Sequence, residues 1–189
     1  MPDLLEIIAG CKKMEKRAQR CLYDMYAPLF LGIAFRYSKS KEDAEDILQE
    51  SFVKILTRID QYSETGSFEG WMKRVLVNTA ISHYRTSQKH DFHKDFDNIA
   101  ETNIENYEVD SSEFTRDELL NSINKLPPGF KVIFNLYAIE GYKHREIAEM
   151  LDISVGTSKS QYSRARALLQ TKLKTLKIEK TSGNKISEK

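Results

Sequence analysis

Residues 140–169, EGYKHREIAEMLDISVGTSKSQYSRARALL, constrain the fold of this chain more than any other segment. The first part places Ile147, Ala148 and Leu151 at helical spacing, where they form one apolar stripe. Residues 152–154 then supply turn chemistry, and Ser154 is positioned to cap a second helix. Two short helices joined by a tight turn predict a helix-turn-helix, a motif that places its second helix in the major groove of DNA.

The second helix of this pair has two different sides. We expect one side to pack on the first helix, and it carries Ser158, Tyr162, Ala165 and Leu169. The opposite side carries Thr157, Ser160, Ser163 and Arg164, with Lys159 at its margin. One long bidentate donor among short polar groups suits contacts to base edges and phosphates. An ordinary charged surface helix would leave the turn and the two-sided pattern unexplained.

Charge is unevenly distributed along the 189 residues, although the formal net charge is only +1. Residues 125–180 contain eleven Lys and Arg against five Asp and Glu, whereas acidic residues dominate 90–113. This distribution indicates nucleic-acid binding at one end and a solvated connector in the middle. We therefore expect an all-α chain with four parts. These are a helical domain over 1–86, an acidic flexible linker over 87–113, a helix-turn-helix domain over 114–177 and a disordered tail over 178–189.

Several classes of protein are disfavoured by what the sequence lacks. No stretch approaches the length of a membrane span and no signal peptide precedes the first helix, so we expect a cytoplasmic protein without membrane insertion. No cysteines or carboxylates accompany His90 and His93 at zinc spacing, so no metal site is expected. The chain also offers no phosphate-cradling glycine loop and no Ser-His-Asp arrangement. We expect neither a cofactor nor an enzymatic activity.

A second amphipathic segment begins at Lys41 and ends near Asp60. Ser40 with Asp43 resembles a capping box at its start. The apolar stripe consists of Ala44, Ile47, Leu48, Phe52, Ile55, Leu56 and Ile59. The opposite face carries Asp46, Gln49 and Glu50, followed by Val53. Taken by itself, this polar face is most simply a solvated surface.

Aromatic and basic residues follow this helix. They begin with Tyr62 and the loop SETGS at 63–67, and continue with Phe68, Trp71, Lys73, Arg74, Asn78, Tyr84 and Arg85. Rings beside cations suit unpaired nucleic-acid bases, which stack on the rings while phosphates pair with Lys and Arg. Packing in the core is the alternative for the rings, and the position of Trp71 is compatible with either role.

Two of these segments together resemble the extracytoplasmic function (ECF) sigma factors of bacterial RNA polymerase. DAEDILQESFVKIL at 43–56 resembles the helix with which such factors hold the polymerase clamp. GTSKSQYSRARALL at 156–169 resembles their recognition helix for the minus-thirty-five promoter element. The resemblance extends from about residue 15 to 175. It implies a sigma factor that binds core polymerase, recognises a bipartite promoter and promotes DNA melting for transcription initiation, with an anti-sigma protein as a further partner.

The resemblance also implies a role for individual residues. Contacts to core polymerase are expected from Asp46, Gln49 and Glu50. Capture of a flipped minus-ten base is expected from the loop Ser63, Glu64, Thr65, Gly66 and Ser67, and further minus-ten contacts from Phe68, Trp71, Asn78 and Arg85. Contacts to minus-thirty-five DNA are expected from Lys159, Ser160, Ser163 and Arg164. The acidic connector takes the place of the linker that threads the polymerase between the two domains.

The chain departs from the family pattern at several positions. Ser82 replaces an Asp that often follows the Asn of the minus-ten segment. Ser158, Gln161 and Tyr162 replace a usual Val, Arg and Leu, which suggests a distinct packing of the recognition helix. Lys143 stands where a Ser often forms a capping box with the Glu three residues later, so we expect the first helix of the pair to be poorly capped.

Two other functions remain as alternatives. A stand-alone helix-turn-helix regulator would bind DNA without polymerase, but it leaves the clamp-like helix and the aromatic loop without a purpose. A DNA enzyme such as a recombinase would need a nucleophile and a cluster of arginines in the first domain, where the sequence instead indicates a helical bundle that binds partners.

Overall fold

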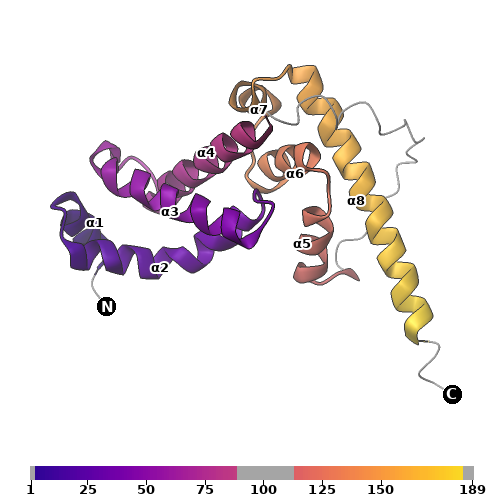
Figure 1. Ribbon diagram of the computed structural model, residues 1–189, viewed down its shortest axis with the longest axis horizontal. Coiled ribbons are helices and arrows are strands. Elements are labelled where there is room, and N and C mark those ends of the chain that lie inside the picture. The colour runs from indigo at the N-terminus through magenta and orange to yellow at the C-terminus, as the bar shows by residue number, and fades with distance from the viewer. Residues whose placement is uncertain (1–2, 89–112, 185–189) are drawn as a thin grey trace. The chain divides into compact units, whose positions relative to one another are not determined.

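The computed structural model describes residues 3–88 and 113–184, and every regular element within these ranges is helical. The chain divides into two compact units, Met1–His90 and Asp91–Lys189 (Figure 1). The predicted all-α fold is therefore confirmed. Most of the predicted acidic linker lies outside the described residues, as do His90 and His93.

The first unit is a bundle of helices. Its elements are α1 (Leu4–Lys12), α2 (Lys16–Phe35), α3 (Lys41–Thr57), the short 3₁₀ helix η1 (Ile59–Gln61) and α4 (Phe68–Gln88). α2 packs against α1 and α3, and α3 packs against α4. Apolar side chains from these helices are almost fully buried between them, among them Leu22, Phe30, Ile47, Ile55, Met72 and Leu76. One of the two bonds of the predicted capping box at α3 is present, because Asp43 N donates to Ser40 Oγ over 3.1 Å.

The contact between α1 and α2 depends on a glycine. The chain reverses direction at residues 13–15, where Met14 has a φ of 61°. A Cβ added at Gly10 would lie 2.6 Å from the Cβ of Ala18. Since two carbon atoms cannot approach so closely, only glycine at position 10 lets the two helices pack at this separation.

The second unit consists of α5 (Arg116–Asn124), α6 (Pro128–Phe134), a π-helical turn η3 (Asn135–Ile139), α7 (His144–Leu151) and α8 (Val155–Asn184). α8 contacts α5, α6 and α7. Its core contains Phe114, Ile123, Leu126, Phe130, Ala165, Leu169 and Leu173. α5 begins with a capping box, in which Thr115 Oγ1 accepts from Glu118 N and Glu118 Oε2 accepts from Thr115 N.

The predicted disordered tail over 178–189 begins too early, because α8 continues to Asn184. Leu173 is buried in the core and Leu176 packs against it. Two ion pairs tie the same part of α8 to the start of the unit: Lys177 Nζ lies 2.6 Å from Glu113 Oε2, and Lys180 Nζ lies 2.7 Å from Glu118 Oε1. The Lys-rich composition of residues 178–189 did not indicate that lysines of α8 pair with Glu113 and Glu118.

Gly10 and Gly32 form a matched pair for testing the packing of α1 on α2. Gly10→Ala should lower the free energy of unfolding by about 1 to 3 kcal/mol, because the new methyl group forces the two helices apart. Gly32 lies in α2 and is exposed. A Cβ added at Gly32 would have nothing within 4 Å. Gly32→Ala should therefore raise that free energy by roughly 0.5 to 1 kcal/mol. Urea unfolding of the full chain measures both, and equal stability of the two variants would contradict the tight contact.

Candidate functional site

The outer face of α3 presents a polar surface next to an apolar side chain. Asp46 and Gln49 are exposed, and Val53 keeps 61% of its surface accessible one turn further along the helix. Val53 is a single exposed apolar side chain on the same accessible face as these polar groups. The structure thus places two of the three residues predicted to contact core polymerase on an accessible face.

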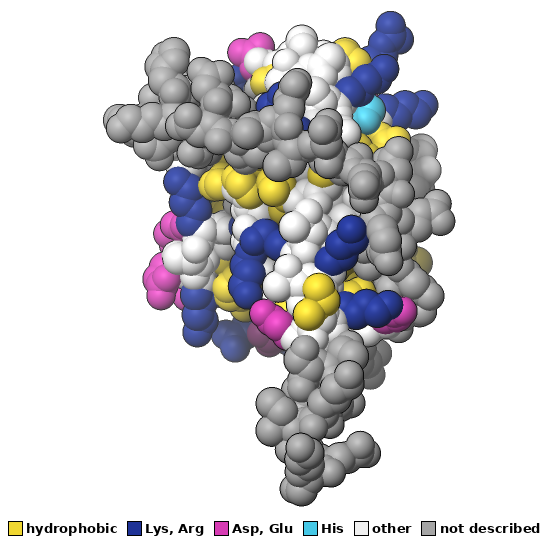
Figure 2. All heavy atoms as spheres, turned by 90° about the vertical axis from the view of Figure 1, so that its right-hand side faces the viewer, with side chains coloured by type: hydrophobic (Ala, Val, Ile, Leu, Met, Phe, Trp, Pro, Cys, Tyr) yellow, Lys and Arg dark blue, Asp and Glu magenta, His cyan; other side chains and the backbone are white. Residues whose placement is uncertain are grey.

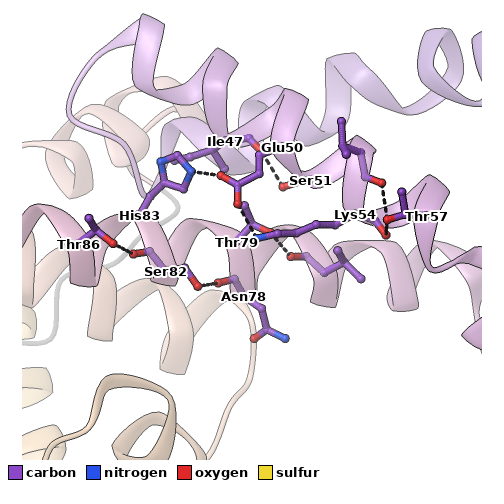
Figure 3. A network of polar contacts seen from close by, with 12 residues as sticks. Ile47, Glu50, Ser51, Lys54, Thr57, Asn78, Thr79, Ser82, His83 and Thr86 are labelled. Carbon is purple, nitrogen blue, oxygen red and sulfur yellow. Dashed lines mark hydrogen bonds and ion pairs between the residues drawn. The ribbon is translucent and has the colours of Figure 1, made fainter.

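Glu50, the third of these residues, is held within the unit by its neighbours (Figure 3). Its Oε1 lies 2.6 Å from Lys54 Nζ, and its Oε2 is hydrogen-bonded to His83 Nε2 of α4. Lys54 Nζ also donates to Thr79 Oγ1 of α4 over 3.3 Å. The bond from Lys54, followed by that from His83, lowers the pKa of Glu50 below its usual value. Glu50 therefore links α3 to α4, a connection that nothing in the sequence pattern indicated.

All five residues of the loop 63–67 are exposed. Internal bonds give the loop a defined shape: Tyr62 Oη donates to the carbonyl oxygen of Gly66, and the hydroxyl oxygens of Ser63 and Thr65 lie 2.8 Å apart. Ser67 Oγ accepts from Gly70 N over 3.2 Å and so caps α4. The loop is therefore a structured element that projects from the start of α4.

Three aromatic rings at the base of this loop pack on one another. The rings of Phe68 and Trp71 are stacked with centroids 5.6 Å apart, and the ring of Tyr62 lies 5.0 Å from that of Phe68 and 5.8 Å from that of Trp71. Phe68 is only 4% exposed, whereas Tyr62 and Trp71 are half-buried. Phe68 thus belongs to the core under the loop, and the two half-buried rings offer surface to a ligand.

The exposed side of α4 continues from this cluster. Asn78, Ser82 and Arg85 are all exposed there. Ser82 Oγ donates to the backbone oxygen of Asn78 over 3.0 Å, and Thr86 Oγ1 donates to that of Ser82 over 3.0 Å (Figure 3). An ionised Asp at position 82 could not donate such a bond. The departure from the family pattern at Ser82 therefore replaces an outward acidic group with a hydroxyl directed at its own helix.

The start of α8 carries the predicted reader of duplex DNA. Thr157 N donates to Ser154 Oγ over 2.9 Å, which confirms the predicted cap. Lys159, Ser160 and Ser163 are exposed and Arg164 is half-buried, on the outer side that the sequence predicted. Figure 2 faces the side on which α8 lies and shows Lys and Arg side chains spread along it.

The inner side of α8 explains two departures from the family pattern. Ser158 is fully buried, and its Oγ lies 2.9 Å from His144 Nδ1 of α7. The ring of Tyr162 lies 4.4 Å from that of Tyr137, which in turn stacks on His144 at 4.3 Å. Burial, followed by the nearby positive charge of Lys159, lowers the pKa of His144. The imidazole of His144 is thus part of a polar and aromatic contact between α7 and α8. The family usually has aliphatic residues at the positions of Ser158 and Tyr162.

Gln161 also faces inward and is only 7% exposed. The sequence pattern did not predict Gln161 on the packed side of this helix. Its neighbour Ser160, which was predicted to face outward, is exposed. The Oγ of Ser160 donates to the backbone oxygen of Thr157 over 3.1 Å. The packed surface of α8 is therefore broader than the stripe that the apolar residues alone predicted.

α7 begins where the sequence predicted, with Lys143 at the position that precedes its first turn. Lys143 N donates to Glu146 Oε2 over 2.7 Å, which is one half of a capping box. The reciprocal bond needs an acceptor at position 143, and an ammonium group has none. A hydroxyl at position 143 could therefore accept a hydrogen bond from the backbone N–H of Glu146, which the ammonium of Lys143 cannot.

Lys143→Ser should complete this capping box and stabilise the second unit by roughly 0.5 to 2 kcal/mol. The substitution also removes a positive charge from the positive end of the helix dipole. Thermal melting of the full chain, with Arg145→Ser as a control that removes a charge within the same turn, measures the gain. An equal or lower melting temperature for Lys143→Ser would show that another group already caps α7.

Within residues 3–88 and 113–184, no group of three His, Cys, Asp or Glu side chains is placed to hold a metal ion. No helix there is long and apolar enough to cross a membrane.

Two family models match the chain, one in each unit. Sigma-70 region 2 matches residues 22–90, and Sigma-70 region 4 matches residues 116–169. The first match includes α3, the loop and α4, and the second includes the helix-turn-helix.

Individual proteins with similarity extend the match over nearly the whole chain. The ECF RNA polymerase sigma-E factor of Haemophilus influenzae is 31% identical over 183 residues, which cover 90% of this chain and 95% of that protein. The corresponding factor of Escherichia coli is 27% identical, over 90% of this chain and 94% of its own length. Among solved structures, the sigma factor RpoE from Bartonella quintana, crystallised with the anti-sigma factor NepR, has a similar fold. Its TM-score is 0.50 at 21% identity, and the match covers 82% of this chain and 96% of that one.

Proposed function

Because this chain belongs to the ECF sigma factors of bacterial RNA polymerase, we propose that it binds core polymerase through its first unit and directs the holoenzyme to a bipartite promoter. The observation that carries this proposal is the presence of both sigma regions, in order, in a match that covers 90% of the chain. A stand-alone helix-turn-helix regulator needs only the second unit, so it is not favoured.

Binding of core polymerase and binding of the promoter are assigned to different helices. The exposed face of α3, with Asp46 and Gln49, binds the polymerase clamp, while Glu50 orients that face through its bonds to Lys54 and His83. The loop 63–67, with Trp71, Asn78 and Arg85, binds the unpaired minus-ten strand. Phe68 supports the loop from the core rather than touching DNA.

The second unit holds duplex DNA at the minus-thirty-five element. Ser160, Ser163 and Arg164 contact base edges and nearby phosphates from the outer side of α8. Lys159, at the margin of that side, pairs with a phosphate. The residues between the units act as the connector that lets both promoter elements be bound at once.

Promoter melting follows from this arrangement. Extruding a base from the duplex costs a few kcal/mol, which stacking on exposed rings and contacts to the loop must offset. The half-buried rings of Tyr62 and Trp71 provide such a platform. The nucleotidyl transfer itself belongs to the polymerase, so this chain acts in the cytoplasm as an initiation factor and not as a catalyst. An anti-sigma protein is its expected inhibitor.

Reversing one charge on α3 tests the binding to polymerase. Asp46→Lys should weaken affinity for core polymerase by about tenfold or more, because it places a like charge against the complementary surface of the partner. Asp46 is preferable to Glu50 for this test, since Glu50 also links α3 to α4. Asp60→Lys, an exposed reversal in η1, is the matched control. Fluorescence anisotropy with labelled protein measures both, and equal affinities would contradict the role of α3.

Two substitutions on α8 separate sequence reading from general attraction to DNA. Arg164→Ala should cost about 1 to 3 kcal/mol at one promoter position, if its guanidinium contacts a guanine in bidentate fashion. Lys159→Ala should weaken binding to all sequences and reduce the salt dependence. A library of minus-thirty-five sequences, transcribed by each holoenzyme at several salt concentrations, distinguishes the two effects. An unchanged sequence preference for Arg164→Ala would show that this side chain does not read bases.

A further inference from the structure

The imidazole of His144 joins α7 to the start of α8 and to η3. Its Nδ1 lies 2.9 Å from Ser158 Oγ, and Ser158 is fully buried in the first turn of α8. The ring stacks on that of Tyr137 of η3 with centroids 4.3 Å apart, and it lies 5.8 Å from the ring of Tyr162 of α8. Three elements of the second unit therefore meet at one half-buried side chain.

These contacts oppose rotation of α8 about its own axis. Ser158 and Tyr162 are four residues apart, so they lie on the same side of the helix, one turn above the other. Since the first turns of α8 form one continuous helix, a rotation that loosens the contact with His144 turns Ser160 and Arg164 by the same angle. Side chains in a binding site must be held to within about 0.5 Å, so a small rotation is enough to weaken base reading.

The contact also depends on the charge of the imidazole. The titratable and charged side chains that face it or adjoin it are Tyr137 of η3, Lys159 and Tyr162 of α8, and the exposed Lys143 and Arg145 on either side of it in the chain. Burial, followed by the positive charge of Lys159, lowers the pKa of His144. The nearest carboxylates in the chain, those of Glu140 and Glu146, do not reverse this effect. A proton added to the ring thus places a second positive charge in a half-buried position beside Lys159.

On the basis of the function proposed above, we propose that His144 is a positioning residue for the DNA-reading turns of α8 and that it supports discrimination among minus-thirty-five sequences only while its imidazole is neutral. The neutral ring holds the inner side of α8 through Ser158 and Tyr162, so the outer side meets the base edges in one orientation. In the protonated ring, repulsion from Lys159 weakens that hold. General attraction to DNA does not fall, because an added positive charge favours binding to phosphates.

The direction of the pH dependence follows from the lowered pKa of His144. The folded unit favours the neutral ring, so the contribution of this contact is fully present above the ordinary histidine pKa of about 6.5. It is lost as the pH falls through the lowered pKa of His144. Sequence discrimination should therefore decrease on acidification, while affinity for unrelated DNA stays constant or rises.

Holoenzyme containing the full chain can be tested on two promoters that differ only at the minus-thirty-five element, one selected from a library with the unaltered protein and one scrambled. Because the polymerase and the minus-ten segment are the same in both complexes, their own pH dependence cancels in the ratio of the two affinities. That ratio should be constant between about pH 8 and 7 and fall at least about threefold by about pH 5.5, which corresponds to a difference of about half a unit in the pKa of His144 between the two complexes.

Four variants connect this behaviour to the imidazole. His144→Gln keeps a hydrogen-bonding group that does not titrate, so it should abolish the pH dependence of the ratio. His144→Phe keeps an aromatic ring but leaves the buried hydroxyl of Ser158 without the imidazole, so it should lower the ratio at every pH. Adding Ser158→Val to His144→Phe supplies an apolar contact and should restore a pH-independent ratio. His93→Gln, outside the described residues, removes a different histidine and should titrate like the unaltered protein.

The outcomes distinguish this inference from the function on which it rests. If the unaltered holoenzyme binds the selected and scrambled promoters equally at neutral pH, the proposed function fails. If it discriminates between them equally well at every pH, or if His144→Gln keeps the loss at low pH, only the positioning role of His144 is overturned. A contact that merely stabilises the fold would lower the melting temperature of the variants without changing the pH profile of the ratio. Circular dichroism at each pH checks that the helices remain folded, and His144→Gln provides the test if His144→Phe does not fold.

Discussion

The packing of α3 on α4 is the interaction on which the surfaces of the first unit depend. We propose that the exposed face of α3 binds a protein partner and that the exposed side of α4 binds unpaired DNA, so the packing of α3 on α4 sets the position of one surface relative to the other. Buried side chains such as Ile47, Ile55, Met72 and Leu76 supply most of the stabilisation, at about 1.5 to 3 kcal/mol for each fully buried group. Polar contacts add direction to this packing. The carboxylate of Glu50 reaches His83, and Lys54 reaches Thr79, so the register between the two helices is fixed on the surface as well as in the core.

A comparable dependence holds in the second unit, where one helix serves two purposes. The first turns of α8 form the second half of the helix-turn-helix, to which we assign the reading of duplex DNA, and α8 also packs against α5 and α6. Ion pairs from Lys177 and Lys180 to residues at the start of the unit hold the far end of α8.

Much of this organisation followed from short-range patterns. Helical periodicity and capping residues predicted α3, α7 and the start of α8. The structure contains all three helices, and the observed caps at Ser40 and Ser154 confirm the starts of α3 and α8. Local sequence failed where a distant partner decides the outcome. The predicted tail contains the last turns of α8, which continue from the part where Leu173 is buried in the core and Leu176 packs against it, and Lys180 in these turns lies beside Glu118. Gln161, polar by type, is buried because the surface of α8 that packs is wider than its apolar stripe.

The sequence by itself determined the all-α fold, the helix-turn-helix and the faces of α3 and α8, because these depend on residue spacing and capping within short segments. The family followed separately, from the resemblance of residues 43–56 and 156–169 to family motifs. Only the tertiary structure decided which of those residues are accessible. It buried Phe68 beneath the loop, tied Glu50 to His83, and placed Lys12 of α1 opposite Glu64. The last two of these depend on the approach of segments far apart in the chain, and that approach is set by how complete helices pack, which no local pattern of residues encodes.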